Sequence, residues 1–448
     1  MSTILLAIAI SLVGGIIFSI IGVIPGTDET ATMAPLTLVL VLIGVPPTVV
    51  FAWFIAILIA MQITHTVPTA MAALPGSTMA VPMVANSNIA KRLGIPHIAM
   101  RKMAAGSLIG SIIAFPIAII VAGALAPLGK VVAAYSGLIF TLGAIIIAYV
   151  SKAKWGAIIS LLPFAFLIQG LQRISVETTG KTLFISIFMG ITIGPMIAEL
   201  FNVMIPMRRE LQKRDKPKVI WLAPESKNVK GSIFPNPFSF FGKSQVGYIA
   251  GASAVSACTF TFSPVGMTVL MGELIAARKK ELYDRITATL GVQDAVSNAT
   301  YLGELLIPMV AFGLPLSPVA LGPASPLFNQ INLHDYLSIS QYFIYGIIGM
   351  VGGCFFAYPL SIKKARSWTE AMFRYVSHEA LIGAFMGLIC MLAFYEAGIF
   401  GIFVAVFVGI FGGILNNLFG IHTGVQFMGY YASGYIVTQV IALCKFIN

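Results

Sequence analysis

The sequence predicts an all-α polytopic membrane protein built from two inverted-topology repeats, with broken or re-entrant helical hairpins and about 10–12 transmembrane segments. The first observation is composition: 58% of the 448 residues are hydrophobic, only 10% are charged, and the mean hydropathy is +0.94. Soluble proteins carry about 25% charged residues. The second is that apolar stretches of about 20 residues, long enough to cross a bilayer, recur along the chain. The third is a pattern of proline and glycine interruptions that occurs once in each half.

Composition also excludes several classes of protein. The apolar N-terminal run has no basic residue before it, so we expect a retained helix and not a cleaved signal. The four cysteines lack metal-ligand spacing, so disulfides and a structural metal are not expected. The net charge of +11 lies in the connections, where topology and anionic lipid explain it better than nucleic acid does.

The first interruption is Ile24-Pro25-Gly26-Thr27-Asp28-Glu29, between apolar runs at 3–24 and 33–45. Pro25 lacks a backbone donor and Gly26 tolerates unusual dihedral angles, so a helix should break there. Broken backbone persists at membrane depth only where protein or a water-filled cavity satisfies it. Asp28 and Glu29 are the only charged side chains in the first ninety residues, so they indicate an ion or substrate site. The alternative is an exposed loop.

The rest of the first half predicts a second broken segment and then four helices. After an apolar run at 48–63, proline and hydroxyl residues between His65 and Pro82 are too frequent for a plain span. We expect 86–102 to be a polar cytoplasmic loop, because its charges are Lys and Arg. The expected spans are 103–126, 131–150, 155–171 and 182–205.

A polar connector divides the chain. Residues 207–244 hold nine Lys and Arg against three Asp and Glu, and they predict a cytoplasmic basic linker. The domain prediction is therefore a first membrane repeat at 1–206, the linker at 207–244 and a second, inverted repeat at 245–448.

The second half repeats the order of the first. Apolar runs at 245–262 and 267–277 flank Ser263-Pro264-Val265-Gly266 and predict a hairpin. The stretch 285–326 contains Ile307-Pro308 and Leu314-Pro315 and is expected to be the second broken segment. The connection 327–336 has no Lys or Arg and is placed outside. The expected spans are 337–360, 379–395, 398–419 and 424–443.

The two halves align at one offset. Val67-Pro68, Leu74-Pro75 and Ser77 match Ile307-Pro308, Leu314-Pro315 and Ser317, each 240 residues later. Charge places the residues after the second broken segment inside in half one and outside in half two, so the repeats are inverted and both termini are extracytoplasmic. Inverted repeats with broken helices are typical of secondary transporters, whose sites lie at the repeat interface.

Several motifs resemble the large permease subunit of the tripartite tricarboxylate transporter family, the TctA-like subunit, as a divergent member. They are Gly22-Val23-Ile24-Pro25-Gly26, Leu74-Pro75-Gly76, Gly106-Ser107-Leu108-Ile109-Gly110, Gly291-Val292-Gln293-Asp294-Ala295-Val296-Ser297-Asn298, Leu306-Ile307-Pro308 and Gly313-Leu314-Pro315. Thr27-Asp28-Glu29 depart from the small residues of the family, and Ser297 replaces one of its paired asparagines.

The resemblance implies uptake of an organic anion, a di- or tricarboxylate, driven by a cation gradient. It also implies a small membrane subunit and an extracytoplasmic solute-binding protein as partners. We expect the cytoplasmic (inner) membrane of a prokaryote as the location, no cofactor beyond Na⁺ or H⁺ as coupling ion, and a homodimer as a candidate assembly.

Hydroxyls, amides and exposed backbone at the breaks would bind the anion, because no Lys or Arg lies in the cores of the broken segments. The candidate substrate-binding residues are Pro25, Gly26, Thr27, Thr30, Pro75, Gly76, Ser77, Thr78, Ser263, Pro264, Gly266, Asn298, Pro315 and Ser317. Carboxylates and their polar neighbours would bind the cation. The candidate cation-coupling residues are Asp28, Glu29, Asp294, Ser297 and Asn298, with Na⁺ expected at Asp28 and Asp294. His65 is interpreted as a hydrogen-bonded core histidine.

Two other functions compete with a transporter. A channel could use the same broken helices as its filter. An enzyme is not expected, because the chain has no HExxH or GxSxG motif and no phosphate-binding loop.

Overall fold

The computed structural model describes residues 3–24, 27, 29–150, 153–180, 182–207, 232–260, 264–375, 378–421 and 423–447. Within these ranges every regular element is helical. Among the described residues, eight helices are long and apolar enough to cross a membrane, and four shorter apolar helices accompany them. The chain is therefore an all-α polytopic membrane protein, as composition predicted.

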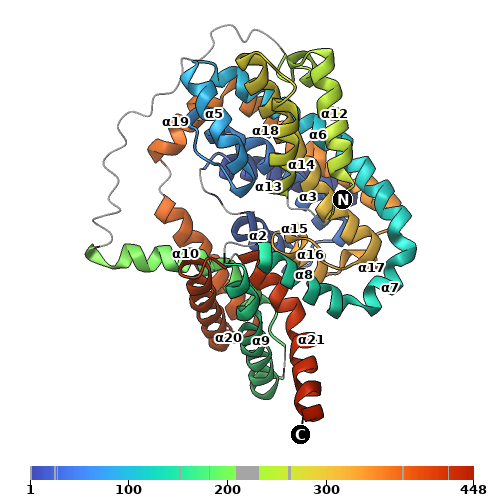
Figure 1. Cartoon of the computed structure of the whole chain (residues 1–448), viewed down its shortest axis with the longest axis vertical. Helices are drawn as coiled ribbons and strands as arrows, with labels where there is room; N and C mark the ends of the chain where they lie inside the picture. Colours follow the sequence, from blue (N-terminus) through green and yellow to red (C-terminus); the bar gives the residue numbers. More distant parts are fainter. Residues whose placement is uncertain are drawn as a thin grey trace. The chain divides into compact units, whose positions relative to one another are not determined.

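The helices of the first half precede the basic linker (Figure 1). They are α1 Thr3–Ile21, α2 Glu29–Leu42, α3 Pro47–Thr64, α4 Thr66–Ala72, the 3₁₀ helix η1 Thr78–Met83, α5 Val84–Arg92, α6 Pro96–Leu125, η2 Ala126–Leu128, α7 Gly129–Ala134, α8 Ser136–Val150, α9 Trp155–Thr179 and α10 Ile185–Met204.

The second half follows a similar order. Its helices are η3 Pro237–Phe240, α12 Lys243–Ala257, α13 Pro264–Ala276, α14 Leu282–Phe312, α15 Pro318–Leu321, α16 Ser325–Asn329, α17 Leu333–Tyr336, α18 Ile339–Lys363, α19 Ala365–Tyr375, α20 His378–Asn417 and α21 Thr423–Ile447. Helix α20 is two helices joined at a kink, because Ala397 and Gly398 have non-helical backbone angles. The kink lies at the boundary that the sequence predicted between two spans.

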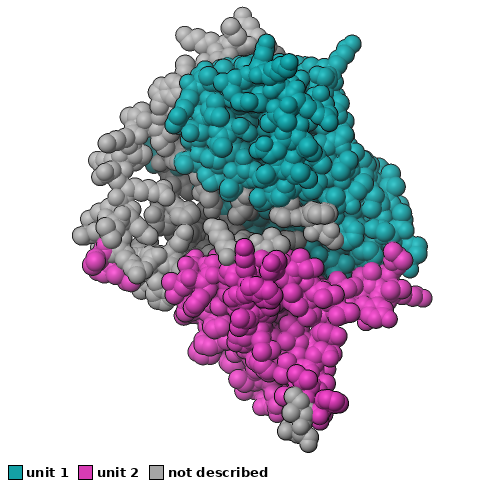
Figure 2. Space-filling model, in the orientation of Figure 1, with its two compact units in different colours: residues 1–127, 218–377 teal, residues 128–217, 378–448 magenta. Residues whose placement is uncertain are grey.

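The helices form two compact units, shown in different colours in Figure 2. Unit 1 comprises residues 1–127 and 218–377, and unit 2 comprises 128–217 and 378–448. The units do not coincide with the two sequence halves, because each half contributes its broken segments to unit 1 and its last helices to unit 2. The division at 1–206, 207–244 and 245–448 stays a prediction about repeats.

Close backbone contact joins α6 of the first half to α14 of the second in unit 1. A Cβ added at Gly106 would collide with the carbonyl oxygen of Gly291, and one added at Gly110 would collide with that of Ala295. The two glycines are four residues apart, so they lie on the same face of α6. Their missing side chains let the two backbones touch.

The same contact occurs between α18 of the second half and α3 of the first. A Cβ at Gly349 would collide with the carbonyl oxygen of Ala52, and one at Gly353 with that of Ala56. Gly349 and Gly353 stand 243 residues after the two glycines of α6, and the two alanines stand 239 residues before their counterparts on α14. Each half thus packs its glycine helix on the long buried helix of the other, which supports a true repeat.

In unit 2, α10 packs on α20, and α21 packs on α8 and α9. Glu396, next to the kink of α20, accepts hydrogen bonds from the backbone N–H groups of Phe184, Ile185 and Ser186 at 2.7–2.8 Å. It also accepts the Ser186 hydroxyl at 2.7 Å. The carboxylate therefore caps the first turn of α10 and fixes it to α20.

The prediction of a polar loop at 86–102 is wrong. Residues 84–92 form α5 and α6 begins at Pro96, so only residues 93–95 lie between two helices. Lys102 is 8% exposed; its Nζ donates to Thr287 Oγ1 at 3.0 Å and Gln245 Oε1 at 3.3 Å. The Lys and Arg residues suggested a polar connection, but a long basic side chain such as that of Lys102 can also be accommodated within helices that offer it hydrogen-bond partners.

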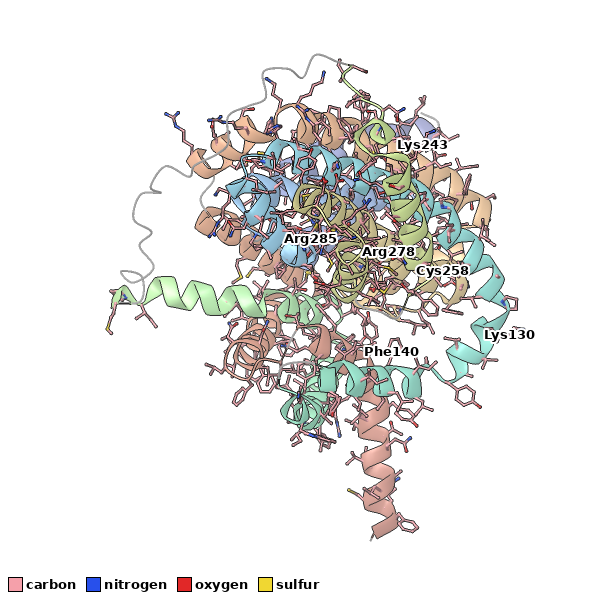
Figure 3. All side chains as sticks on the ribbon, turned by 45° about the horizontal axis from the view of Figure 1, so that its top comes forward. Lys130, Phe140, Lys243, Cys258, Arg278 and Arg285 are labelled. Atoms are coloured by element: carbon pink, nitrogen blue, oxygen red, sulfur yellow. The ribbon has the colours of Figure 1, made fainter. Side chains whose placement is uncertain are left out.

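Two expected break points are shifted. Helix α14 continues through Pro308 and ends at Phe312, so the interruption begins at Gly313. In the hairpin, α12 ends at Ala257 and Pro264 is the first residue of α13, a position where proline costs no hydrogen bond. Figure 3 labels Lys243, the first residue of α12, Cys258, which directly follows this helix, and Arg278, which follows α13.

Candidate functional site

The long helix α14 carries a row of buried polar side chains in unit 1. Every residue from Ile286 to Phe312 is buried. Asp294, Ser297, Asn298 and Glu304 are all 0% exposed, and their spacing places them on one broad face of the helix. Polar groups this deep in a membrane protein need partners or a ligand.

Asn298 connects α14 to α6. Its Nδ2 donates to Ser111 Oγ at 2.6 Å and to Ser107 Oγ at 2.9 Å. Ser107 Oγ in turn donates to the backbone oxygen of Gln62 on α3 at 3.4 Å. Three helices from both halves therefore meet around one amide.

Asp294 lies beside the broken segment of the first half. Its Oδ1 is 3.7 Å from His65 Nε2, at the one-residue turn between α3 and α4. His65 Nδ1 lies 2.9 Å from Ser77 Oγ, which accepts the backbone N–H of Met79 at 3.2 Å. If Ser77 donates to Nδ1, the imidazole hydrogen is on Nε2 and faces the carboxylate. His65 is thus a hydrogen-bonded core histidine, as interpreted from the sequence, and it also contacts a carboxylate.

The two interruptions of the first half meet. The backbone N–H of Thr27 donates to the carbonyl oxygen of Gly76 at 3.1 Å, and Thr27 Oγ1 donates to that of Ile24 at 2.7 Å. The chain leaves α4 through Ala73, whose φ of 59° is left-handed. Gly76 then passes so close to His65 that a Cβ would collide with the His65 carbonyl oxygen. Glycine is therefore required at this position.

The second half has an equivalent interruption. Gly313 ends α14 with a φ of 63°, 240 residues after Ala73. Ser317 Oγ accepts the backbone N–H of Ala320 at 3.1 Å and donates to the carbonyl oxygen of Glu304 at 2.7 Å. That carbonyl has lost its helical partner, because residue 308 is a proline without an N–H. Ser317 thereby allows α14 to continue through Pro308.

The unpartnered polar atoms of this region are mostly oxygens. They include Gln62 Oε1, Gln293 Oε1, Ser297 Oγ, Asn298 Oδ1 and both carboxylate oxygens of Asp294 and Glu304, with His65 Nε2 as the nitrogen among them. The carboxylate and amide oxygens among these atoms bind protons and hard cations such as Na⁺, not anions. Across the described ranges, no three His, Cys, Asp or Glu side chains gather as a metal centre. A cation here would therefore bind one carboxylate with amide, hydroxyl or carbonyl oxygens.

The structure brings several predicted residues together and leaves others out. Thr27, Gly76, Ser77, Asp294 and Asn298 join into one connected region of unit 1 through the bonds given above. Glu29 is buried in the first turn of α2, and Thr30 follows it there. Ser317 and buried Pro315 lie at the second interruption, whereas Gly266 is exposed on α13. Pro25, Gly26, Asp28 and Ser263, and the side chain of Thr78, lie outside the described residues.

Sequence reasoning missed three residues that surround Asn298 and Asp294, and it gave His65 only a structural role. Ser107 belongs to a family motif and Ser111 follows that motif directly, whereas Gln62 interrupts an apolar run. A polar residue inside an apolar helix is itself a signal of a site.

Comparison with known proteins gives one match. A family model described as the Tripartite tricarboxylate transporter TctA family matches residues 8–423. No curated protein and no solved structure matches the chain. The matched range contains every described residue of the buried polar region.

Proposed function

Because the chain belongs to the tripartite tricarboxylate transporter TctA family, we propose that it is the permease of a secondary active transporter. In this proposal it imports a small organic anion, a di- or tricarboxylate, by symport with Na⁺ or H⁺. The family is one of transporters, and the multi-pass helical fold agrees with that role.

The buried oxygens around Asp294 carry the proposal. An ionised carboxylate with no cation beside it is strongly disfavoured away from water. Asp294 is fully buried, and the nearest titratable side chain given by the structure is His65 at 3.7 Å. No Lys or Arg in the described part of the chain bonds to this carboxylate. A coupling cation bound with Ser297 and Asn298 would supply the missing positive charge.

The organic anion needs a different environment, rich in donors. The interruptions are the places where helices end, and the hydroxyls of Thr27, Ser77 and Ser317 lie there. These hydroxyls hydrogen-bond within the protein, so the anion would bind by replacing those bonds or through other backbone N–H groups at the helix ends. The first interruption reaches Asp294 through Ser77 and His65. Anion and cation would therefore occupy neighbouring parts of unit 1, which would allow the binding of one to strengthen the binding of the other.

The family name describes a tripartite system, so this permease is proposed to act with a small membrane subunit and an extracytoplasmic solute-binding protein. The cytoplasmic membrane of a prokaryote is the proposed location, with both termini outside and a homodimer as a candidate assembly. The proposal assigns no cofactor other than the coupling ion.

Uptake into proteoliposomes tests the proposal. A panel of labelled di- and tricarboxylates is offered with a Na⁺ gradient, with a pH gradient, or with neither, in the presence of the proposed partner subunits. Wild-type uptake should saturate and should depend on one gradient. Asp294→Asn should lose at least tenfold in cation-driven uptake, whereas Glu281→Gln, an exposed carboxylate just before α14, should retain it. Flux that dissipates any gradient without coupling would identify a channel and contradict the proposal.

A further inference from the structure

A second fully buried carboxylate lies on α14 and has no role in the site around Asp294. We propose that Glu304 binds a second coupling cation, so that one transported anion moves with two monovalent cations. This inference rests on the proposed transport function and adds a site and a stoichiometry to it.

The environment of Glu304 calls for a positive charge. Its side chain is 0% exposed. Neither carboxylate oxygen makes a hydrogen bond of standard geometry within the described ranges, although the backbone N–H of Val319 lies close enough to stabilise a negative charge on Glu304. No Lys, Arg or His of the described chain pairs with it. A carboxylate in such a place is stable only when it carries a proton or a bound cation.

The site is separate from that of Asp294. The two residues are ten positions apart on one helix, about 15 Å along its axis. Asp294 faces His65, whereas Glu304 lies where Ser317 and Val319 return after the interruption. One cation could not bridge carboxylates at that separation, so each would bind its own.

The repeat explains why two sites should exist. Ser77 and Ser317 are 240 residues apart, and each accepts a backbone N–H two or three residues later. Ser77 connects to Asp294 through His65, and Ser317 bonds directly to the backbone of Glu304. A fully buried carboxylate of α14 therefore lies beside each of these two serines, in addition to the buried Glu29 at the start of α2.

Charge balance gives the second cation a purpose. A dicarboxylate imported with one monovalent cation would carry net negative charge into a cell whose interior is negative, so the membrane potential would oppose uptake. With two cations the transported set is neutral, and a third would make the potential favourable. The proposed stoichiometry therefore suits a dicarboxylate, whereas a tricarboxylate moving with two cations would still carry one net negative charge.

The test counts cations on the full chain purified in detergent and in proteoliposomes with its partner subunits. Binding of ²²Na⁺ counts sodium ions. Without Na⁺, the pH change that accompanies binding of the carboxylate substrate counts protons, so the two measurements distinguish the two cations. The wild type should bind two cations and show a Hill coefficient approaching two for cation-driven uptake. Glu304→Gln should bind one and give a Hill coefficient of about one. Glu304→Asp, which keeps the carboxylate, should bind two with weaker affinity, and Glu281→Gln should match the wild type.

Three results overturn the inference. Glu304→Gln with an unchanged cation count would show that the carboxylate binds no coupling ion. Asp294→Asn that loses both cations while Glu304→Gln loses none would assign both to the first site. A wild type that binds no cation and shows no gradient dependence would refute the proposed function itself. Size-exclusion profiles establish that each variant is folded. If Glu304→Gln does not fold, the cation affinity of Glu304→Asp is compared with that of the wild type instead, and an unchanged affinity would contradict the inference.

Discussion

At the residue scale, single side chains repair the backbone where helices are interrupted. Pro308 has no backbone N–H, so the carbonyl oxygen of Glu304 in α14 lacks its usual helical donor. The hydroxyl of Ser317 donates a hydrogen bond to this carbonyl instead. In the first half the corresponding serine, Ser77, instead bonds the imidazole of His65 and accepts the backbone N–H of Met79. In a membrane, where water cannot compensate, such repairs decide whether a helix can contain proline.

Ser317→Ala should destabilise the protein by about 1–3 kcal/mol, because the Glu304 carbonyl and the Ala320 N–H both lose a buried partner. Pro308→Ala supplies a helical N–H for the same carbonyl, so the double variant should recover part of this loss. Thermal unfolding in detergent measures both, and Ser367→Ala, an exposed serine with a similar local bond, is the control. Strictly additive effects would show that the two residues do not share this carbonyl.

At the element scale, pairs of small residues set the distance between helices. Both α6 and α18 use two glycines four residues apart to approach a helix of the other half. The absence of side chains allows backbone contact that aliphatic residues would prevent.

Gly106→Ala should destabilise unit 1 by about 1–3 kcal/mol, because the added Cβ meets the backbone of Gly291, which has no rotamer to change. Gly349→Ala should behave alike at the equivalent contact. Gly123→Ala is the matched control on α6, since its Cβ would have ordinary contact with Ile339 at 3.8 Å. Melting curves in detergent compare the three. Equal melting of Gly106→Ala and Gly123→Ala would mean that the helices separate without cost.

The α10 cap in unit 2 depends on one carboxylate. Glu396→Gln should cost about 1–3 kcal/mol, because one of two acceptor oxygens becomes a donor facing backbone N–H groups. Glu177→Gln breaks an exposed pair with Arg173 and should cost about 0.5 kcal/mol or less. Hydrogen exchange at residues 184–186 reports the cap directly. Unchanged protection there in Glu396→Gln would contradict the assignment.

At the scale of the whole molecule, each compact unit is built from both halves of the sequence. Unit 1 holds the interruptions of both halves, and unit 2 holds their last helices. Equivalent glycine contacts at offsets of 239 and 243 support the repeat, while its inverted orientation in the membrane is still a prediction from charge.

Cysteine labelling tests the orientation. In a background without the four native cysteines, Lys230→Cys should react only from the cytoplasmic side and Gln330→Cys only from outside. The basic linker and the uncharged connection predict this result. Labelling of both positions from one side would rule out inverted repeats.

The sequence by itself determined the membrane class, the helix-rich fold and the approximate positions of the interruptions. These follow from local properties: apolar runs of bilayer length, and proline or glycine where a helix cannot continue. It could not place the break points to the residue, since whether Pro308 ends α14 depends on a hydroxyl nine residues later.

Only the tertiary structure decided which polar residues meet. Asp294 and His65 are 229 positions apart, and Asn298 and Ser107 are 191 apart. Helix α14 is buried on all sides, so no amphipathic pattern indicates which face of it will contact α6 and which the first interruption. That choice comes from the glycine contacts that fix α14 against α6, and such contacts depend on shape, which sequence periodicity does not encode.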